Sequence, residues 1–145
     1  MEKHYYKKAL TIAGSDSGGG AGIQADIKAF SANGVYGMSA ITAVTAQNTQ
    51  GVNDIHPVLE EIIKSQITAV MDDIGTDAIK IGMLHSSKVI RKVVETLNKY
   101  NPPNIVIDPV MVATSGDKLL QDEAIETLIK EMLPIATVIT PNLPE

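Results

Sequence analysis

Residues 11 to 26 read Thr11-Ile12-Ala13-Gly14-Ser15-Asp16-Ser17-Gly18-Gly19-Gly20-Ala21-Gly22-Ile23-Gln24-Ala25-Asp26, and this stretch decides the fold. An apolar run breaks into a glycine-rich turn, and the turn leads into a helical pattern. Glycine accepts positive φ and lacks a Cβ, and a helix start offers N–H groups without intrahelical partners. We therefore predict a strand, a turn and a helix around a polar, electropositive floor where a small ligand approaches bare backbone. Asp26 adds one directed acceptor to that floor.

The rest of the chain alternates short apolar runs with helical patterns, which is typical of βαβ units in a parallel sheet covered by helices. Apolar residues three and four positions apart predict helices that begin near Ile23, Leu59, Val89 and Ile125, the first of them ending near residues 33–34. The predicted strands cover residues 9–13, 39–45, 78–81, 105–107 and 136–140, and residues 51–58 fit an edge strand or a flap. The predicted fold class is α/β with a mostly parallel sheet.

The composition narrows the range of partners and surroundings. The 145 residues fit one domain of ordinary size. Lysine and arginine number 12 against 17 aspartate and glutamate residues, and aromatic residues are few, which argues against a nucleic-acid surface. The chain has no cysteine and no long apolar run, so we expect no disulfide, no thiolate metal site, no membrane span and a cytoplasmic location.

The chain stops at Thr140-Pro141-Asn142-Leu143-Pro144-Glu145, directly after a predicted strand and where the pattern predicts another helix. A parallel sheet that ended on an uncovered strand would expose apolar surface and an unpaired edge. We therefore expect a further C-terminal part that these 145 residues do not include.

The loops that follow the predicted strands are the candidate site, because open α/β sheets bind ligands beyond the carboxyl ends of their strands. Each of these loops carries polar or small residues. They are the glycine loop, Ala46-Gln47-Asn48-Thr49, Gly82-Met83-Leu84, Asp108-Pro109-Val110-Met111, and Asn142 with Glu145. The sequence thus predicts one binding rim.

Two common phosphate motifs fit the glycine loop poorly. A Walker A loop needs a lysine and then a serine or threonine after its second glycine, but Gly20 and Ala21 follow Gly19. Residues 20–25 match the loose dinucleotide fingerprint, which also requires an acid about 20 residues later. No acid lies between Asp26 and Asp54. A tight turn whose glycines serve packing alone stays open as an alternative.

Several motifs, spread over nearly the whole chain, carry a resemblance to a known family. They are Ala9-Leu10-Thr11-Ile12-Ala13-Gly14-Ser15-Asp16, Gly19-Gly20-Ala21-Gly22-Ile23-Gln24-Ala25-Asp26, Ala46-Gln47-Asn48-Thr49, Lys80-Ile81-Gly82-Met83-Leu84, Asp108-Pro109-Val110-Met111, Ser115-Gly116-Asp117 and Thr140-Pro141-Asn142-Leu143-Pro144-Glu145. They resemble the hydroxymethylpyrimidine and hydroxymethylpyrimidine phosphate kinases of thiamine biosynthesis, within the ribokinase-like superfamily. The resemblance implies a three-layer α/β/α fold in which residues 1–145 are the N-terminal portion of a single kinase domain. Such kinases are longer, so the anion hole, the catalytic base and most of the nucleotide pocket are expected beyond residue 145.

The resemblance implies a set of substrate-binding residues: Gly14, Ala21, Asp26, Gln47, Met83 and Val110. An aminopyrimidine edge has both donors and acceptors, so the carboxylate of Asp26 beside the amide of Gln47 suits it, and a wrong ligand leaves both unpaired. Met83 and Val110 would pack on the ring. From the residues alone, Gln47 also fits a capping or loop amide, and Met83 and Val110 fit core positions.

Oxygen-bearing side chains at the rim suit magnesium, which proteins hold through one or two carboxylates, waters and substrate phosphates. The resemblance assigns Asp108 and Glu145 to Mg²⁺, acting partly through water, and Asn142 to phosphate. From the residues alone, Asn142 and Glu145 equally fit a helix capping box. Lys80, at a strand end, fits a structural lysine with its stem on apolar surface better than a residue that orients a loop or a phosphate.

The resemblance implies transfer of the γ-phosphoryl group of ATP to the hydroxymethyl group of the pyrimidine and then to the resulting monophosphate. Because this reaction depends on positioning, magnesium and an anion hole, we expect the 145-residue chain alone to be inactive. Two alternatives stay open. One is a pyridoxal-type kinase, since pyridoxine is also a flat nitrogen ring with a hydroxymethyl group, and the other is a non-catalytic pyrimidine-binding module. A homodimer is typical of the family.

Overall fold

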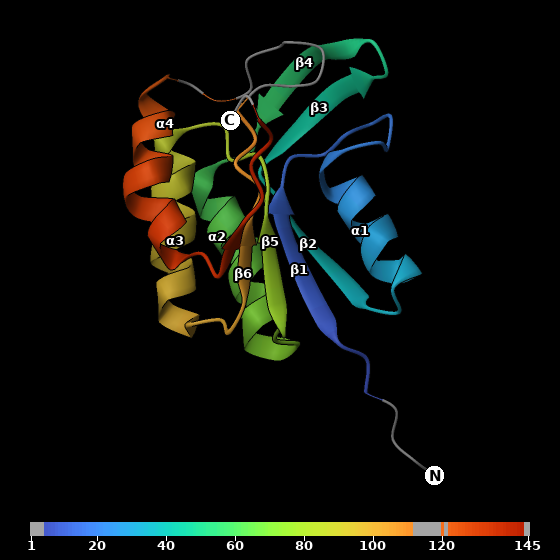
Figure 1. The fold of residues 1–145 in the computed structure, drawn as a ribbon, viewed down its shortest axis with the longest axis vertical. Coiled ribbons are helices and arrows are strands. Elements are labelled where there is room, and N and C mark those ends of the chain that lie inside the picture. Colours follow the sequence, from blue (N-terminus) through green and yellow to red (C-terminus); the bar gives the residue numbers. More distant parts are fainter. Residues whose placement is uncertain (1–4, 112–119, 121, 144–145) are drawn as a thin grey trace.

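The computed structural model describes residues 5–111, 120 and 122–143 of the chain. Parallel strands form its central sheet in the order β2-β1-β5-β6-β7 (Figure 1). Their bounds are β1 Lys8–Ala13, β2 Tyr36–Ile41, β5 Ala78–Ile81, β6 Ile105–Ile107 and β7 Val138–Ile139. Because β1 lies between β2 and β5, the glycine loop at its carboxyl end leaves from the interior of the sheet rather than from an edge.

Helices cover both faces of this sheet, so the predicted three-layer α/β/α fold is confirmed (Figure 1). On one face lies α1 (Gly22–Ala32), and on the other lie α2 (Glu60–Asp73), α3 (Ser87–Tyr100) and α4 (Asp122–Thr127). The apolar side chains of α3 recur at helical spacing and are buried, and Ser86 caps its first turn by accepting from Val89 N. The core includes Leu10, Ile12, Ile63, Ile67, Ile79, Ile81, Ile90 and Val93, all at most 1% exposed.

Residues 39–45 do not form the single strand that the pattern predicts. The chain turns at Thr42, and β3 (Ala43–Asn48) pairs antiparallel with β4 (Gly51–Pro57) in a separate two-stranded sheet. Small and β-branched residues favour a strand on both sides of Thr42, so the composition does not reveal that the strand ends there. The loop predicted at residues 46–49 is also wrong, since most of it belongs to β3. The β3–β4 hairpin is the flap that residues 51–58 allowed, and it stands beyond the carboxyl ends of the sheet strands (Figure 1).

The end of the described chain is less regular than predicted. After α4 the chain forms a π-helical turn at Leu128–Met132 and a 3₁₀ turn at Leu133–Ile135. Pro134 has no N–H to continue the helical bonds, which accounts for the change of pitch. The last strand, β7, is shorter than the predicted residues 136–140.

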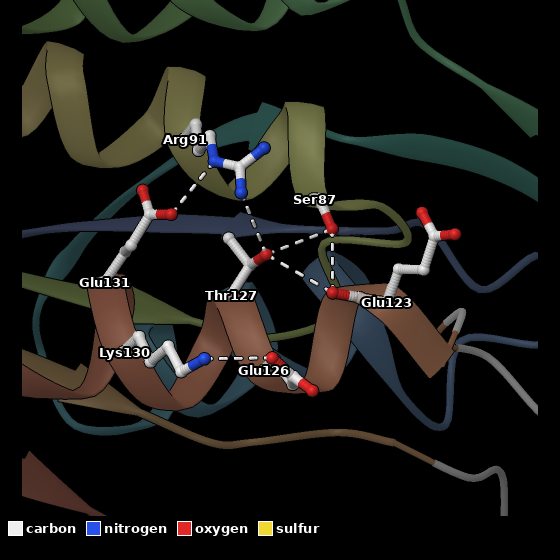
Figure 2. A network of polar contacts seen from close by, with 7 residues as sticks. All are labelled: Ser87, Arg91, Glu123, Glu126, Thr127, Lys130 and Glu131. Atoms are coloured by element: carbon white, nitrogen blue, oxygen red, sulfur yellow. Dashed lines mark hydrogen bonds and ion pairs between the residues drawn. The ribbon is translucent and has the colours of Figure 1, made fainter.

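Polar contacts fasten α4 and the turn after it to α3, as Figure 2 shows. Arg91 Nε donates to Glu131 Oε1 at 2.9 Å. Thr127, which is buried, donates from Oγ1 to Ser87 Oγ at 3.1 Å, and Ser87 donates on to the carbonyl of Glu123 at 3.0 Å. These contacts complete the helical layer opposite α1. Within the described residues, none of the helices has the length and apolar character needed to cross a membrane.

Candidate functional site

A pocket of about 240 Å³ opens at the carboxyl ends of β1, β5 and β6. Residues of α1 and of the β3–β4 hairpin complete its wall. All six residues predicted to bind the substrate line it: Gly14, Ala21, Asp26, Gln47, Met83 and Val110. Asp108, predicted to bind metal, lines it as well, and so does Lys80. Four of the five predicted rim loops therefore border one concave site, and Asn142 of the fifth does not line it.

The glycine loop folds back onto the end of β1. Gly22 has a φ of +55°, and a Cβ at this position would collide with the carbonyl oxygen of Gly14, so only glycine fits here. Ile23 N donates to the same carbonyl at 2.9 Å, which joins the first turn of α1 to β1. A Cβ on Gly14 would lie 2.6 Å from Met83 Cε. Glycine at position 14 therefore makes the space in which Met83 reaches the pocket.

Asp16 takes up part of the expected electropositive floor. Asp16 Oδ1 accepts from Gly18 N at 2.8 Å, and Oδ2 accepts from Gly20 N at 2.9 Å and from Ala21 N at 2.8 Å. The N–H groups of three loop residues thus point to a carboxylate of the chain itself. The sequence does not distinguish a loop whose N–H groups bind Asp16 from a loop whose N–H groups bind an external anion, because both need the same glycines. These three N–H groups are therefore engaged within the loop and do not point to a ligand in the pocket.

Asp26 reaches from α1 to the sheet and is held there through one oxygen. Thr11 Oγ1 donates to Asp26 Oδ2 at 2.6 Å, and Lys80 Nζ lies 3.2 Å from that oxygen. Thr11 and Lys80 are partners in the register of β1 and β5, so both side chains rise on the face that α1 covers. Within the described residues, no hydrogen bond or ion pair engages Asp26 Oδ1. That oxygen can accept from a ligand.

Lys80, predicted from its position at a strand end to be a structural lysine, forms ion pairs at the pocket. Its Nζ lies between two carboxylates, 3.2 Å from Asp26 Oδ2 and 3.6 Å from Asp108 Oδ2. Gly82 leaves the space for it, since a Cβ at that position would lie 3.0 Å from Lys80 Nζ. The flexible stem of lysine lets the ammonium group lie beside this glycine. One cation therefore joins two acidic residues that are far apart in the sequence.

Gln47 borders the pocket from the end of β3. Two reciprocal hydrogen bonds fix this part of the hairpin to the glycine loop: Gln47 N donates to Ser17 Oγ at 2.8 Å, and Ser17 Oγ donates to the carbonyl of Gln47 at 2.6 Å. The side-chain amide of Gln47 lies 3.3 Å from Thr45 Oγ1, which donates its proton to the carbonyl of Ser15 at 2.8 Å. Gln47 from the hairpin and Asp26 from α1 thus border the same pocket.

The predicted metal and phosphate residues are described only in part. Asp108 lies at the pocket beside Lys80, and Asn142 is exposed after β7. Glu145 and the motif at residues 115–117 lie outside the described residues. Among the residues that are described, no group of three or more His, Cys, Asp or Glu side chains could hold a metal ion. Of the two residues predicted to bind metal, Asp108 is the one that the structure describes, and it lines the pocket.

The sequence contained a signal for two side chains whose part in the site was not predicted. Thr11 and Lys80 each interrupt an apolar strand with one polar side chain. Thr11 is fully buried, and a polar side chain in that position needs a partner. Asp26 is that partner. A polar residue in a buried strand therefore predicts a polar partner on the helix that covers the sheet.

Fold and pocket together define the class of the protein. A three-layer α/β fold with a parallel sheet carries a concave site at the carboxyl ends of its strands, bordered by a glycine loop and by acid, amide and lysine side chains. This is a ribokinase-like protein with a pocket at the edge of the sheet where such folds bind ligands.

Comparison with known proteins gives the family. The family model described as phosphomethylpyrimidine kinase matches residues 16–145, and the chain belongs to this family, as the motifs predict. A hydroxymethylpyrimidine/phosphomethylpyrimidine kinase of Bacillus subtilis is 54% identical over 138 residues, which are 95% of this chain and 51% of the relative. The chain therefore spans about half the length of that relative.

Solved structures show the same relationship. A phosphomethylpyrimidine kinase from Clostridium difficile has a TM-score of 0.90 and 58% identity, covering 96% of this chain and 60% of that one. A pyridoxal kinase from Staphylococcus aureus, in complex with AMP-PCP and pyridoxal, has a TM-score of 0.82 and 40% identity, covering 97% of this chain and 49% of that one. Both likenesses extend over nearly all of this chain.

Proposed function

We propose that this chain forms the substrate-binding half of a kinase that phosphorylates hydroxymethylpyrimidine and then its monophosphate, with ATP as donor, in thiamine biosynthesis. One observation carries the proposal: a single pocket is lined by all six residues that the family resemblance assigns to the pyrimidine. In this proposal, residues 1–145 are the N-terminal portion of a single ribokinase-like kinase domain.

The side chains at the pocket match the edge and faces of an aminopyrimidine. Asp26 presents Oδ1 to the ligand, because Lys80 and a threonine of β1 hold Oδ2, and a carboxylate oxygen accepts from an amino group. The amide of Gln47 can both donate to a ring nitrogen and accept from a hydroxyl. Met83 and Val110 supply apolar contact to the ring. In the proposed complex these contacts hold the hydroxymethyl oxygen in place for in-line attack.

The proposed reaction also needs Mg²⁺, and the donor set is compatible with it. Asp108 is a hard oxygen ligand at the pocket, and magnesium requires only one or two carboxylates besides water and phosphate. We assign Asp108 and Glu145 to the cation and Asn142 to the phosphate groups. When bound, the cation neutralises charge that develops on the transferred group. The catalytic base and the anion hole are placed beyond residue 145.

A coupled ATP-consumption assay on the protein at its natural length tests the proposal. We expect turnover with hydroxymethylpyrimidine and with its monophosphate, and a marked loss of kcat/KM in Gln47→Ala. Gln50→Ala is the matched control, because Gln50 is an exposed residue at the tip of the same hairpin. No phosphorylation of either pyrimidine would contradict the proposal.

A pyridoxal-type kinase is the second candidate, favoured by the likeness to the pyridoxal kinase of Staphylococcus aureus. Pyridoxal carries a hydroxymethyl group on a nitrogen ring, so it presents a similar acceptor. The same assay separates the two, since the pyrimidine proposal expects a higher kcat/KM for hydroxymethylpyrimidine than for pyridoxal. Equal or better use of pyridoxal would favour the second candidate.

The proposal places the rest of the catalytic machinery outside residues 1–145, so this chain alone is expected to be inactive. Its relative in Bacillus subtilis is matched over only 51% of its length. The assay on the 145-residue chain should show no turnover above background. Turnover near that of the natural-length protein would contradict this part, and would require all the catalytic groups to lie within these residues.

A homodimer completes the proposal. The β3–β4 hairpin forms a separate two-stranded sheet, and one of its faces, with Thr45 buried, packs on the glycine loop. Its outer face carries Val44, which is 50% exposed, beside His56 in the pairing register. Sedimentation of the natural-length protein should give twice the monomer mass, and a monomer at micromolar concentration would contradict the expectation.

A further inference from the structure

Asp16 is a buried acid that does not line the pocket. It is 5% exposed, and among the described residues it is the one ionisable side chain that is buried. No lysine or arginine in the described part of the chain pairs with it. A buried carboxylate is costly unless donors surround it, and here the N–H groups of Gly18, Gly20 and Ala21 are the donors, at 2.8 to 2.9 Å.

The loop is shaped around this carboxylate. Gly19, with a φ of +77°, turns the chain so that the N–H groups converge. A Cβ on Gly18 would lie only 3.2 Å from Asp16 Oδ1, so the absence of a side chain lets the oxygen approach. Converging backbone N–H groups of this kind form an anion-binding nest. In this chain the nest holds an anion that the sequence itself provides.

The nest continues directly into the wall of the pocket. Ala21, whose N–H group is bonded to Asp16 Oδ2, lines the pocket, and so does Gly22. The backbone at position 22 packs against the carbonyl of Gly14 with no room for a Cβ. Any movement of Ala21 therefore moves this part of the pocket wall. Asp16 is bonded to this wall but does not itself line the pocket.

We propose that Asp16 is a positioning residue for substrate binding: its carboxylate fills the nest of the glycine loop and sets the place of Ala21 and Gly22. A second consequence is that the loop holds no phosphate of substrate or donor while Asp16 occupies it. The kinetic part of this inference rests on the proposed function. The structural part does not, because the hydrogen bonds of Asp16 exist without ligand.

Replacement and chemical rescue test the proposal in the protein at its natural length. Asp16→Ala empties the nest, and we expect KM for hydroxymethylpyrimidine to rise roughly tenfold or more while kcat changes much less, because the acceptor is bound poorly but reacts normally once bound. Added formate should enter the vacated nest and bring KM back toward the wild-type value.

Asp16→Asn fills the space but turns an NH₂ group toward N–H donors, so its KM should rise and formate should not restore it. Asp73→Ala, which removes an exposed acid at the end of α2, is the control and should match the wild type.

Amide resonances give a second measurement that does not require activity. In Asp16→Ala the resonances of Gly18, Gly20 and Ala21 should shift during a formate titration, and in the wild type they should not. Rescue of the alanine variant alone, together with these shifts, supports the proposal. An unchanged KM in both variants, or equal effects of formate on both, would overturn it. If Asp16→Ala does not fold, the asparagine variant decides, since a wild-type KM there would also overturn it. A wild-type protein without kinase activity would refute the proposed function, while the amide titration would still test the role of Asp16.

Discussion

Replacing Lys80 with methionine removes the cation between Asp26 and Asp108 and keeps the length of the side chain. At 3.2 and 3.6 Å, and with an effective dielectric constant of about 20, each ion pair has a Coulomb energy of about 5 kcal/mol. Desolvation of the charges cancels most of this energy. The side chains of the three residues are 22, 16 and 32% exposed, between the surface and the buried limit, so a net contribution of about 1 to 3 kcal/mol remains.

We expect this energy to appear in ligand binding. Without the ammonium group, Asp26 keeps only the hydroxyl of Thr11 on Oδ2, and its free oxygen is no longer held toward the pocket. The affinity of the natural-length protein for hydroxymethylpyrimidine should therefore fall roughly 5- to 150-fold, as measured by isothermal titration calorimetry. Lys99→Met is the matched control, because Lys99 is an exposed lysine of α3 that lies 3.7 Å from Glu95.

The controls make the result decisive. Circular dichroism should show that Lys80→Met is folded at the temperature of the titration. A folded Lys80→Met protein that binds the pyrimidine within about twofold of the wild type would refute the reasoning. A loss of affinity in Lys99→Met as large as in Lys80→Met would also refute it, because the effect would then come from net charge rather than from the pocket.

Three further predictions concern single positions. Gly22→Ala should lower the free energy of unfolding by about 2 kcal/mol or more, because φ is +55° and the new Cβ would collide with the carbonyl of Gly14; urea denaturation measures this, and an unchanged midpoint would contradict it. The N–H group of Lys8 holds the pKa of the Asp77 carboxyl below its ordinary value of 3.8. The stability from this contact is therefore present above that value and is lost as the pH falls through the lower folded-state pKa. Asp77→Asn should accordingly be less stable than the wild type at neutral pH and equal to it near pH 2, whereas a difference that does not depend on pH would refute the assignment. Asn101 ends α3 with a φ of +45°, so Asn101→Ala should destabilise by about 1 kcal/mol and Asn101→Gly should not; equal melting temperatures for the two variants would contradict this.

The sequence predicted best the elements whose apolar residues recur at a regular spacing. The apolar spacing of α3 and the alternation of strands with helices left few other arrangements for the chain. Asp26 and Gln47 could be predicted to share a site, because the segments that follow parallel strands gather at one edge of the sheet, and both α1 and the hairpin that carries Gln47 follow such strands. That rule needs only the order of the elements and no coordinates.

The parts that could not be predicted depend on contacts between distant residues. The break at Thr42 is invisible in composition, since residues on both sides suit a strand. The orientation of Lys80 follows from the bare Gly82 backbone and from two acids brought near by the fold. Asp16 looks like one more polar loop residue until three converging N–H groups are seen to bond to it. Predicting these features requires knowing which distant residues the fold brings into contact.

A crystal structure of the natural-length protein with hydroxymethylpyrimidine would show whether Asp26 and Gln47 bind the pyrimidine in this pocket. We expect the ring to lie in the pocket between Met83 and Val110, with Asp26 Oδ1 and the amide of Gln47 within hydrogen-bond distance of its edge. A ring bound elsewhere, or bound in this pocket without contact to Asp26 and Gln47, would contradict the account.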